Sequence, residues 1–335
     1  CQALDREKDL LWEPVQVAHR IAQLCEQINP DNILVDHVSF GSTLGVYATG
    51  RRFTTLVPGH PSQLPVGKER YGIPATWPAC MQPEPNALTD QEGITDRVTK
   101  TFTDRWNAAL AIIAPTMSPV KDAFRVHGNQ VLYNSSNHYH PVERSPHLPI
   151  HHEFVGPLVR DEELAKPFQQ WLAQEPEKPL VYVALGTFLS HRADVLSTIA
   201  IALQQANVRV AMAIGASPMT AFEPLPAGWL LAPSLPQVAL LGECDLVIHH
   251  GGNNSVQEAL GLGVRQIILP FSTDQFANAA DLERTGQATV VSPNHICPTS
   301  FAQVVKVTLT LPEPKPIMAQ SWAALAGILR TPIEA

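Results

Sequence analysis

The sequence predicts an α/β protein made of two doubly wound domains, the first of them incomplete. Its 335 residues exceed what most single hydrophobic cores hold. In the second half, short apolar runs alternate with amphipathic segments of helix length, and a shorter series of the same kind opens the chain. A stretch punctuated by prolines separates the two series, so we expect one domain at residues 1–153 and another at residues 154–335.

Composition limits the partners that this chain can bind. Apolar residues make up 45% of the sequence and charged residues 16%, which is typical of a globular protein. The net charge of −8 argues against nucleic acid binding, and no apolar run approaches the roughly 18 residues of a membrane span. Five cysteines with no close pair in sequence indicate a reducing compartment, so we expect a cytoplasmic protein. The sequence does not indicate an oligomeric state.

The first domain begins with alternating helices and strands. Apolar residues recur at helical spacing over residues 10–28, and a short apolar run at 33–35, closed by Asp36, indicates a buried strand. We expect further elements at 40–49 (helix), 53–57 (strand), 93–114 (helix) and 131–133 (strand). The chain also opens with Cys1, in a helix-like pattern, and we expect it to be a fragment of a longer protein.

The second domain shows a complete doubly wound alternation. We expect strands at 180–185, 208–214, 229–231, 245–249, 266–270 and 288–291, and helices at 193–206, 255–262 and 274–285. Ligands of doubly wound sheets bind beyond the carboxyl ends of the strands. Functional side chains are therefore expected in the segments that directly follow these strands.

The most informative of these segments follows the strand at 245–249. It reads His250, Gly251, Gly252, Asn253, Asn254 and Ser255. Glycines let the backbone come close to a ligand, and the free amides of a helix start suit phosphate. Asn254 or Ser255 can cap the helix or donate to phosphate, and His250 can donate to a diphosphate. The alternative is an ordinary strand–turn–helix connection. The lack of a G-x-G-x-x-G pattern argues against a nicotinamide cofactor.

Two further elements extend this pattern. Glu258 lies one helical turn past Ser255, so its carboxylate can face the same side and accept hydrogen bonds from ribose hydroxyls. Asp274 and Gln275 follow the next strand, and a carboxylate beside a carboxamide suits a polyhydroxylated sugar. A helix N-cap is an equally good explanation for Asp274 taken alone.

The order and spacing of these residues resemble the donor-site signature of family 1 (UDP-glycosyltransferase-like) enzymes. The elements that match are His250 to Ser255, Glu258-Ala259, Gly263-Val264, Pro270, Asp274-Gln275 and Asn278-Ala279. Three flanking pieces agree, namely Leu185-Gly186-Thr187, Pro236-Gln237 and the linker-like residues 154–157. The resemblance covers residues 155–310 and, more loosely, 30–57. It departs from the family at Ser234, where Trp is frequent, and at Asn253, where plant members usually carry Trp.

The resemblance implies a GT-B fold, in which two Rossmann-like domains face a cleft. It implies an inverting transferase that moves a sugar from a UDP- or dTDP-activated donor to a hydroxyl of a small, largely apolar acceptor. No metal and no cofactor beyond the nucleotide sugar is expected. By this resemblance the donor-binding residues would be Gly186, Thr187, Leu235, Gln237, His250, Gly251, Gly252, Asn253, Asn254, Ser255, Glu258, Asp274 and Gln275. Within this set, Thr187 and the residues around His250 would hold the diphosphate, Glu258 the ribose, Gln237 and its neighbours the base, and Asp274 and Gln275 the sugar.

The catalytic base of the resembled family is a His in the first loop of the first domain, oriented by an Asp at the end of a later strand. Asp36 resembles that Asp, although a turn or helix-capping role is the competing interpretation. The adjacent His37 is not distinguished from a surface residue. No loop matching that of the base precedes Asp36, so we expect the base to lie upstream of this sequence. A non-catalytic nucleotide-sugar-binding module or auxiliary subunit, or less favourably a nucleotide-sugar epimerase, is the alternative.

Two other stretches contain residue types that bind ligands. Seven prolines between residues 58 and 85 predict a long loop that carries His60, Tyr71 and Trp77, which could line an acceptor pocket. Packing is the simpler explanation for each aromatic residue. Five histidines crowd a linker-like stretch at 137–157, namely His138, His140, His147, His151 and His152. Their spacing matches no standard zinc site, so no metal centre is expected.

Overall fold

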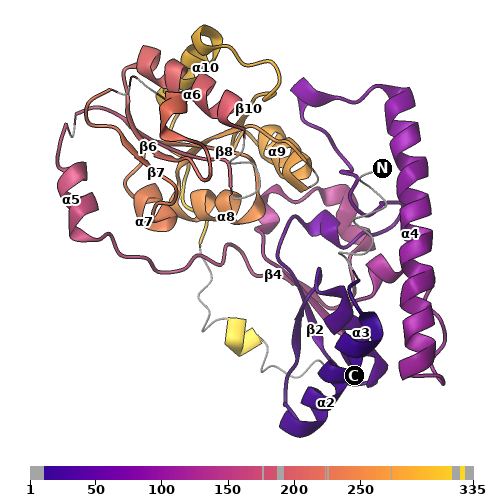
Figure 1. Ribbon diagram of the computed structural model, residues 1–335. Coiled ribbons are helices and arrows are strands. Elements are labelled where there is room, and N and C mark those ends of the chain that lie inside the picture. The colour runs from indigo at the N-terminus through magenta and orange to yellow at the C-terminus, as the bar shows by residue number, and fades with distance from the viewer. Residues whose placement is uncertain are drawn as a thin grey trace. The chain divides into compact units, whose positions relative to one another are not determined.

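The computed structural model describes residues 11–175, 177–186, 192–222, 224, 226–272, 274–318 and 325–328. Contacts along the chain divide it into two compact units. Unit 1 comprises Cys1–Ala75, Pro83–Gly156 and Gln320–Ala335, and unit 2 comprises Thr76–Gln82 and Pro157–Ala319. The division after Gly156 lies three residues beyond the expected domain boundary. Figure 1 labels the elements of both units.

Unit 1 contains a parallel sheet with the strand order β1-β2-β3-β4. Its strands are β1 (Leu34–Asp36), β2 (Thr54–Val57), β3 (Gln130–Tyr133) and β4 (His152–Phe154), and its helices are α2 (Pro14–Ile28), α3 (Phe40–Ala48) and α4 (Pro85–Ile113). Short 3-10 helices occupy Pro61–Gln63, Ala123–Arg125, Asn137–Tyr139 and Val142–His147. Two expectations were wrong here. The predicted linker contains β4, which pairs with β3, and α4 begins eight residues before its expected start, with a proline in its first turn.

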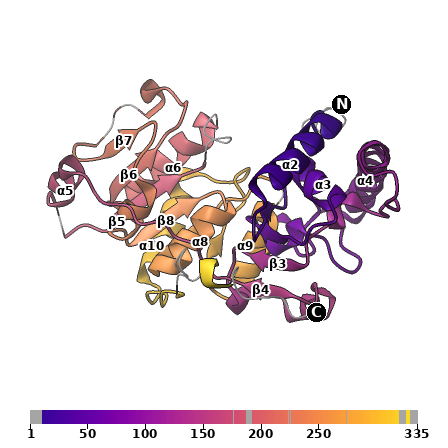
Figure 2. The ribbon, with the colours of Figure 1, turned by 90° about the horizontal axis from the view of Figure 1, so that it is seen from below.

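The helices of unit 1 are held by close backbone approach and by aromatic packing. Figure 2 shows α2 and α3 side by side, and a Cβ at Gly45 of α3 would lie 3.0 Å from the Ala18 backbone of α2. On the other side of α3, Phe40 meets Phe102 and Phe124 edge to face. Tyr71 of the proline-rich loop stacks on Phe124 at 4.1 Å. Packing against Phe124 therefore accounts for Tyr71, in agreement with the packing interpretation of the sequence.

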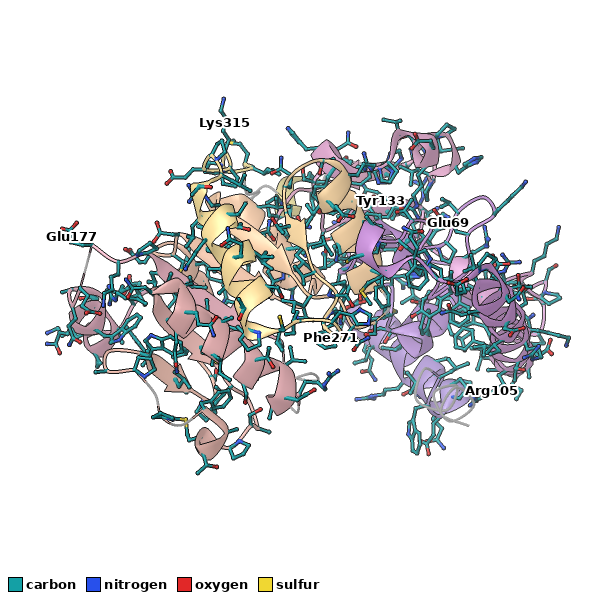
Figure 3. The ribbon with its side chains drawn as sticks, turned by 90° about the horizontal axis from the view of Figure 1, so that it is seen from above. Glu69, Arg105, Tyr133, Glu177, Phe271 and Lys315 are labelled. Atoms are coloured by element: carbon teal, nitrogen blue, oxygen red, sulfur yellow. The ribbon has the colours of Figure 1, made fainter. Side chains whose placement is uncertain are left out.

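A buried ion pair orders the proline-rich loop of unit 1. Arg144 donates from Nε to the Glu69 carboxylate at 2.7 Å, and both side chains are largely buried. The same guanidinium donates to the carbonyls of Pro61 and Leu64. Tyr133 lies close to Glu69 (Figure 3), and burial raises the pKa of its phenol to about 12. A charge pair taken out of water needs such hydrogen bonds, and here Nε and one terminal nitrogen of Arg144 make them, whereas its other terminal nitrogen is buried with no partner among the described residues.

Unit 2 is a fully parallel six-stranded sheet with the strand order β10-β9-β8-β5-β6-β7. Its strands are β5 (Leu180–Ala184), β6 (Arg209–Ala213), β7 (Leu230–Ala232), β8 (Leu246–His249), β9 (Arg265–Ile268) and β10 (Thr289–Val290). Its helices are α5 (Lys166–Leu172), α6 (Ala193–Ala206), α7 (Gln237–Leu241), α8 (Asn253–Leu262), α9 (Asp274–Arg284) and α10 (Pro298–Thr310), with 3-10 helices at Ala79–Met81 and Met219–Phe222. The expected strands are all present, whereas α5, α7 and α10 were not expected.

The sheet of unit 2 buries both of its faces. Val181 and Val183 of β5 pack with α6 and α10, whereas the alternate residues Tyr182 and Ala184 pack with α7 and α8. Figure 1 shows these two pairs of helices on opposite faces. The residues of β5 alternate because successive strand side chains point to opposite faces. Of the helices described in either unit, none is both long and apolar enough to cross a membrane.

The segment Thr76–Gln82 packs on α9 within unit 2. The Ala79 amide donates to the Glu283 carboxylate at 2.8 Å, and the ring of Trp77 lies 4.8 Å from that of Phe276. Contact with Phe276 therefore explains Trp77, again in favour of the packing interpretation.

Candidate functional site

Two neighbouring strands of unit 2 end at the same edge of the sheet. β5 and β8 pair in parallel, with Ala184 opposite His249. The strand order reverses between them, because β6 and β7 follow on one side and β9 and β10 on the other. Ligands of doubly wound sheets bind beyond the strand ends at such a switch point. The segment after β5 contains Gly186, and the segment after β8 contains the His250–Ser255 run.

The helix α8 begins directly after the glycine turn that follows β8, without a side-chain cap. The helix begins at Asn253, its N-cap is Gly252, and no described side chain caps it. The expectation that Asn254 or Ser255 caps this helix was therefore wrong, since both lie within its first turn, with Asn254 exposed and Ser255 half-buried. An uncapped helix start carries free N–H groups and partial positive charge, which together suit an anion.

His250 packs between two glycines beside this helix start. A Cβ added to Gly186 would lie 2.7 Å from Cε1 of the His250 ring, and one added to Gly252 would overlap its Nε2. Burial lowers the pKa of His250 to about 4, against the opposing effect of a hydrogen bond to the Ala184 carbonyl. The imidazole is therefore neutral near pH 7. Its Nδ1 is buried without a partner among the described residues. The predicted neighbour Thr187 lies outside those residues.

Gly251 has a backbone that only glycine adopts readily. Its φ is +87°, and a Cβ there would lie 2.9 Å from Ile268 Cγ2 and 3.2 Å from the Gln275 carbonyl oxygen. The turn after β8 thus lies directly against the end of β9 and the start of α9.

Gln237, Ser255 and Glu258 form a hydrogen-bonded cluster. The Gln237 amide donates to the Glu258 carboxylate and to Ser255 Oγ, the latter at 3.3 Å. Partial burial raises the pKa of Glu258, and the hydrogen bond from Gln237 opposes that shift. The sequence assigned all three side chains to one ligand, and the structure brings them together. Leu235, just before α7, is buried in the apolar core on that face.

Gln275 and Asn253 are both engaged within unit 2. Gln275 Oε1 accepts from the backbone amides of Phe271, at 2.9 Å, and Ser272, at 3.2 Å. Phe271, labelled in Figure 3, marks this loop before α9. Asn253 is buried, and its Oδ1 accepts from Gln257 Nε2 at 3.2 Å. The Asn253 side chain at the start of α8 is therefore directed into the protein and bonded to Gln257 within the helix. Asp274 is the first residue of α9 and half-buried, not its N-cap.

Asp36 and His37 follow β1 in unit 1. Asp36 Oδ1 accepts from the Val38 amide at 2.9 Å, so the expected turn role is present, and its relay role stays a prediction. Asp36 also lines a cavity of about 430 Å³ between α2, β1 and α3. His37 is buried, donates from Nε2 to the Gln63 carbonyl at 2.9 Å, and has its pKa lowered by burial to about 4. The sequence did not distinguish it from a surface residue.

The histidines of the predicted linker do not converge. His138 Nδ1 lies 3.1 Å from Ser136 Oγ, His152 donates to the Pro149 carbonyl, and His140 packs against Phe154. Within the part of the chain that the structure describes, no three His, Cys, Asp or Glu side chains are grouped to hold a metal ion.

Known glycosyltransferases are similar to this chain in sequence and in fold. A model of the family described as UDP-glucoronosyl and UDP-glucosyl transferase matches residues 95–321. The uncharacterized UDP-glucosyltransferase YdhE of Bacillus subtilis (strain 168) is 28% identical over 159 residues, which are 47% of this chain and 39% of that protein. A PGL/p-HBAD biosynthesis glycosyltransferase of Mycobacterium tuberculosis (strain ATCC 25177 / H37Ra) is 28% identical over 163 residues, 49% of this chain and 37% of the relative. These aligned segments span less than two fifths of either relative.

Solved glycosyltransferase structures superpose on most of the chain. The glycotransferase of kitacinnamycin has a TM-score of 0.69 and 17% identity, covering 92% of this chain and 75% of its own. Glycosyltransferase VinC in complex with dTDP has a TM-score of 0.61 and 18% identity, covering 98% and 77%.

The fold and the edge of β5 and β8 thus define an α/β protein of the GT-B class, as the sequence predicts. The chain belongs to the UDP-glucoronosyl and UDP-glucosyl transferase family.

Proposed function

We propose that this protein is an inverting glycosyltransferase. It would take a sugar from a UDP- or dTDP-activated donor and attach it to a hydroxyl of a small, largely apolar acceptor. Family membership supports the reaction class, and the arrangement at the carboxyl edge of unit 2 supports the donor. The nucleotide sugar is the only co-substrate that this proposal needs. Four free thiols, at Cys25, Cys80, Cys244 and Cys297, agree with a cytoplasmic location.

The observation that carries the proposal is the uncapped start of α8 beside His250. The backbone amides at this helix start and the positive end of the helix dipole would stabilise a diphosphate without a charged side chain. The unpartnered Nδ1 of His250 is a second polar group at that point. The negative charge of a bound diphosphate would favour the imidazolium form of the ring, with the proton taken from solvent, and Nδ1–H would then donate to a phosphate oxygen. In the reaction these groups would stabilise the leaving nucleoside diphosphate.

The cluster around Glu258 suits the nucleoside. In the structure the Glu258 carboxylate accepts from the Gln237 amide, and its burial raises its pKa. Two ribose hydroxyls are stronger partners for an ionised carboxylate than one amide, because charge-assisted hydrogen bonds are short and strong. Ribose binding would free Gln237 to contact the base. Asp274 and the NH2 group of Gln275 would bind sugar hydroxyls from the loop before α9, where Gln275 Oε1 is fixed by two amides.

Inversion requires a base that removes the proton of the acceptor hydroxyl while this oxygen attacks the anomeric carbon from the face opposite the leaving group. We assign Asp36 the part of orienting such a base. Its position at the carboxyl end of β1 beside a cavity of about 430 Å³ supports this.

Calorimetric titration with UDP, dTDP and a nucleotide sugar tests the donor site. We expect binding that Asn254→Ala weakens and that Glu258→Ala nearly abolishes. Thr308→Val is the matched control and should bind normally, because it removes only the buried hydroxyl of Thr308 in α10, which pairs with Thr289 of β10. A folded wild-type chain that binds none of these nucleotides would overturn the proposal.

A second candidate is a module that binds a nucleotide sugar without turning it over. It is favoured by the fact that every assigned donor-binding residue belongs to unit 2. Release of UDP from a nucleotide sugar in the presence of varied hydroxylated acceptors separates the two. Tight donor binding without acceptor-dependent release would favour the module.

A further inference from the structure

The two peptide groups of Gly251 are each held by a buried side chain. The Gly251 amide donates to Nδ1 of His249 at 3.1 Å. The Gly251 carbonyl accepts from Nδ2 of Asn278 at 3.0 Å. The first bond fixes the peptide plane that precedes Gly251, and the second fixes the plane that follows it. Together they set the φ and ψ of a residue whose positive φ leaves it free to move in the absence of such contacts.

His249 is held in one tautomer. Its Nδ1 accepts from Gly251, so the proton resides on Nε2, which donates to Gln266 Oε1 at 3.0 Å. The side chain is fully buried at the end of β8, and Gln266 is buried on the adjacent strand β9. A neutral imidazole in this environment is a rigid acceptor, because both of its nitrogens are satisfied and its ring cannot turn without losing a buried hydrogen bond.

Asn278 reaches the same turn from α9. It is fully buried one helical turn past Asp274, and its amide group is oriented by the Gly251 carbonyl. The turn after β8 is thus pinned from its own strand and from the helix that also carries Asp274 and Gln275. Neither buried side chain is exposed to a ligand, so any effect of theirs on ligand binding must pass through the Gly251 backbone.

We propose that His249 and Asn278 are positioning residues that fix the Gly251 turn, and through it His250 and the first turn of α8, in the geometry that receives a diphosphate. This inference rests on the proposed function of that site. Its physical basis is pre-organisation, because a turn already held in the binding conformation loses less entropy when the anion binds.

Two substitutions at position 249 separate positioning from mere stability. In His249→Asn, Oδ1 takes the place of Nδ1 and keeps the acceptor for the Gly251 amide, while the bond to Gln266 is lost. In His249→Gln, the side-chain amide nitrogen of the new glutamine takes the place of Nε2 of the imidazole and keeps the bond to Gln266. The acceptor for the Gly251 amide is lost. Each variant forfeits one buried hydrogen bond, so we expect similar losses of thermal stability.

The readouts are UDP affinity by calorimetry and hydrogen exchange of the Gly251 amide, both on the full chain. We expect His249→Asn to bind UDP within about threefold of wild type and His249→Gln to bind roughly tenfold more weakly. Asn278→Leu should also bind roughly tenfold more weakly, and the Thr308→Val control should bind normally. The Gly251 amide should stay protected in His249→Asn and exchange at least tenfold faster in His249→Gln.

Equal affinity and equal exchange in the two position-249 variants would overturn the inference. If the wild-type chain binds no nucleotide, the proposed function is wrong. The hydrogen exchange of the Gly251 amide then tests separately whether His249 fixes the turn. Protection that depends on the acceptor at position 249 would support it, and protection that is independent of this acceptor would overturn it.

Discussion

Replacing Gly252 by alanine is a direct probe of how His250 is packed. The backbone of Gly252 has φ −61° and ψ 140°, which alanine adopts without strain. The added methyl group would nevertheless overlap Nε2 of the His250 ring and lie 2.9 Å from its Cε1. The ring also lies close to Gly186, where an added Cβ would be 2.7 Å from its Cε1. The substitution therefore acts on His250 and not on the turn itself.

The expected losses of stability and of UDP affinity follow from the contacts that the His250 ring loses. To make room it has to turn away and lose its hydrogen bond to the Ala184 carbonyl, which contributes about 1 kcal/mol. Overpacking a filled site costs roughly 1–3 kcal/mol in free energy of unfolding. If His250 contacts the diphosphate, its displacement also removes a charge-assisted hydrogen bond, so UDP affinity should fall about tenfold or more.

Calorimetry with UDP and thermal unfolding test this expectation together. Gly242→Ala is the matched control, because a Cβ there meets only the Ala239 carbonyl oxygen, at an ordinary 3.6 Å. We expect the control to behave as wild type and Gly252→Ala to lose both affinity and a few degrees of melting temperature. Unchanged UDP affinity in a Gly252→Ala protein would refute the assignment of His250 to the diphosphate.

Three further predictions follow from the geometry. Glu258→Gln should weaken UDP binding roughly tenfold and dTDP binding less, because a deoxyribose offers one hydroxyl fewer; equal losses in calorimetry would contradict the ribose contact. Burial, and secondarily the neighbouring His250, lowers the pKa of His249 to about 3. As the pH falls, the imidazole of the unfolded chain therefore takes up its proton before that of the folded chain. The free energy of unfolding should be unaffected above pH 6.5 and should fall by up to about 1.4 kcal/mol per pH unit between pH 6.5 and pH 3. Urea titrations should find a smaller slope in His249→Asn. Arg144→Met leaves Glu69 buried and unpaired, so unit 1 should lose about 3–5 kcal/mol in urea unfolding while UDP affinity is retained.

The strands of unit 2 could be predicted from the sequence because each is a short apolar run bounded by turn residues. The helix α6 (Ala193–Ala206) was predicted with its observed bounds for a similar reason, since its apolar residues keep a strict helical period. The strand β4 (His152–Phe154) could not be predicted, because three residues, two of them polar, carry no periodic signal. Its pairing with β3 comes from the tertiary structure. The early start of α4 at Pro85 was hidden by a first half that is polar and largely exposed.

The candidate donor site was predictable to the extent that it follows from order along the chain. Parallel strands bring their carboxyl ends to one edge, so Gly186 and His250 had to meet there once β5 and β8 were neighbours. The roles of His249 and Asn278 were not predictable, because both contact backbone atoms of Gly251, and no residue pattern displays such a bond. His37 was missed for a similar reason, since its partner is the carbonyl of Gln63 in an irregular loop.

The three glycines at this edge differ in what requires them, the turn itself or the packing of His250. A turn needs glycine only where φ is positive, and Gly251, at φ +87°, meets that need. Gly252 has a φ that any residue adopts, so the turn alone does not require glycine there. What favours glycine there is the His250 ring, which also lies close to Gly186, a residue whose φ of +76° already requires glycine. The half-buried His250 imidazole has one buried, unpartnered nitrogen beside a helix start without a side-chain cap. The proposed anion site would use this arrangement, whereas an ordinary strand–turn–helix connection does not need it.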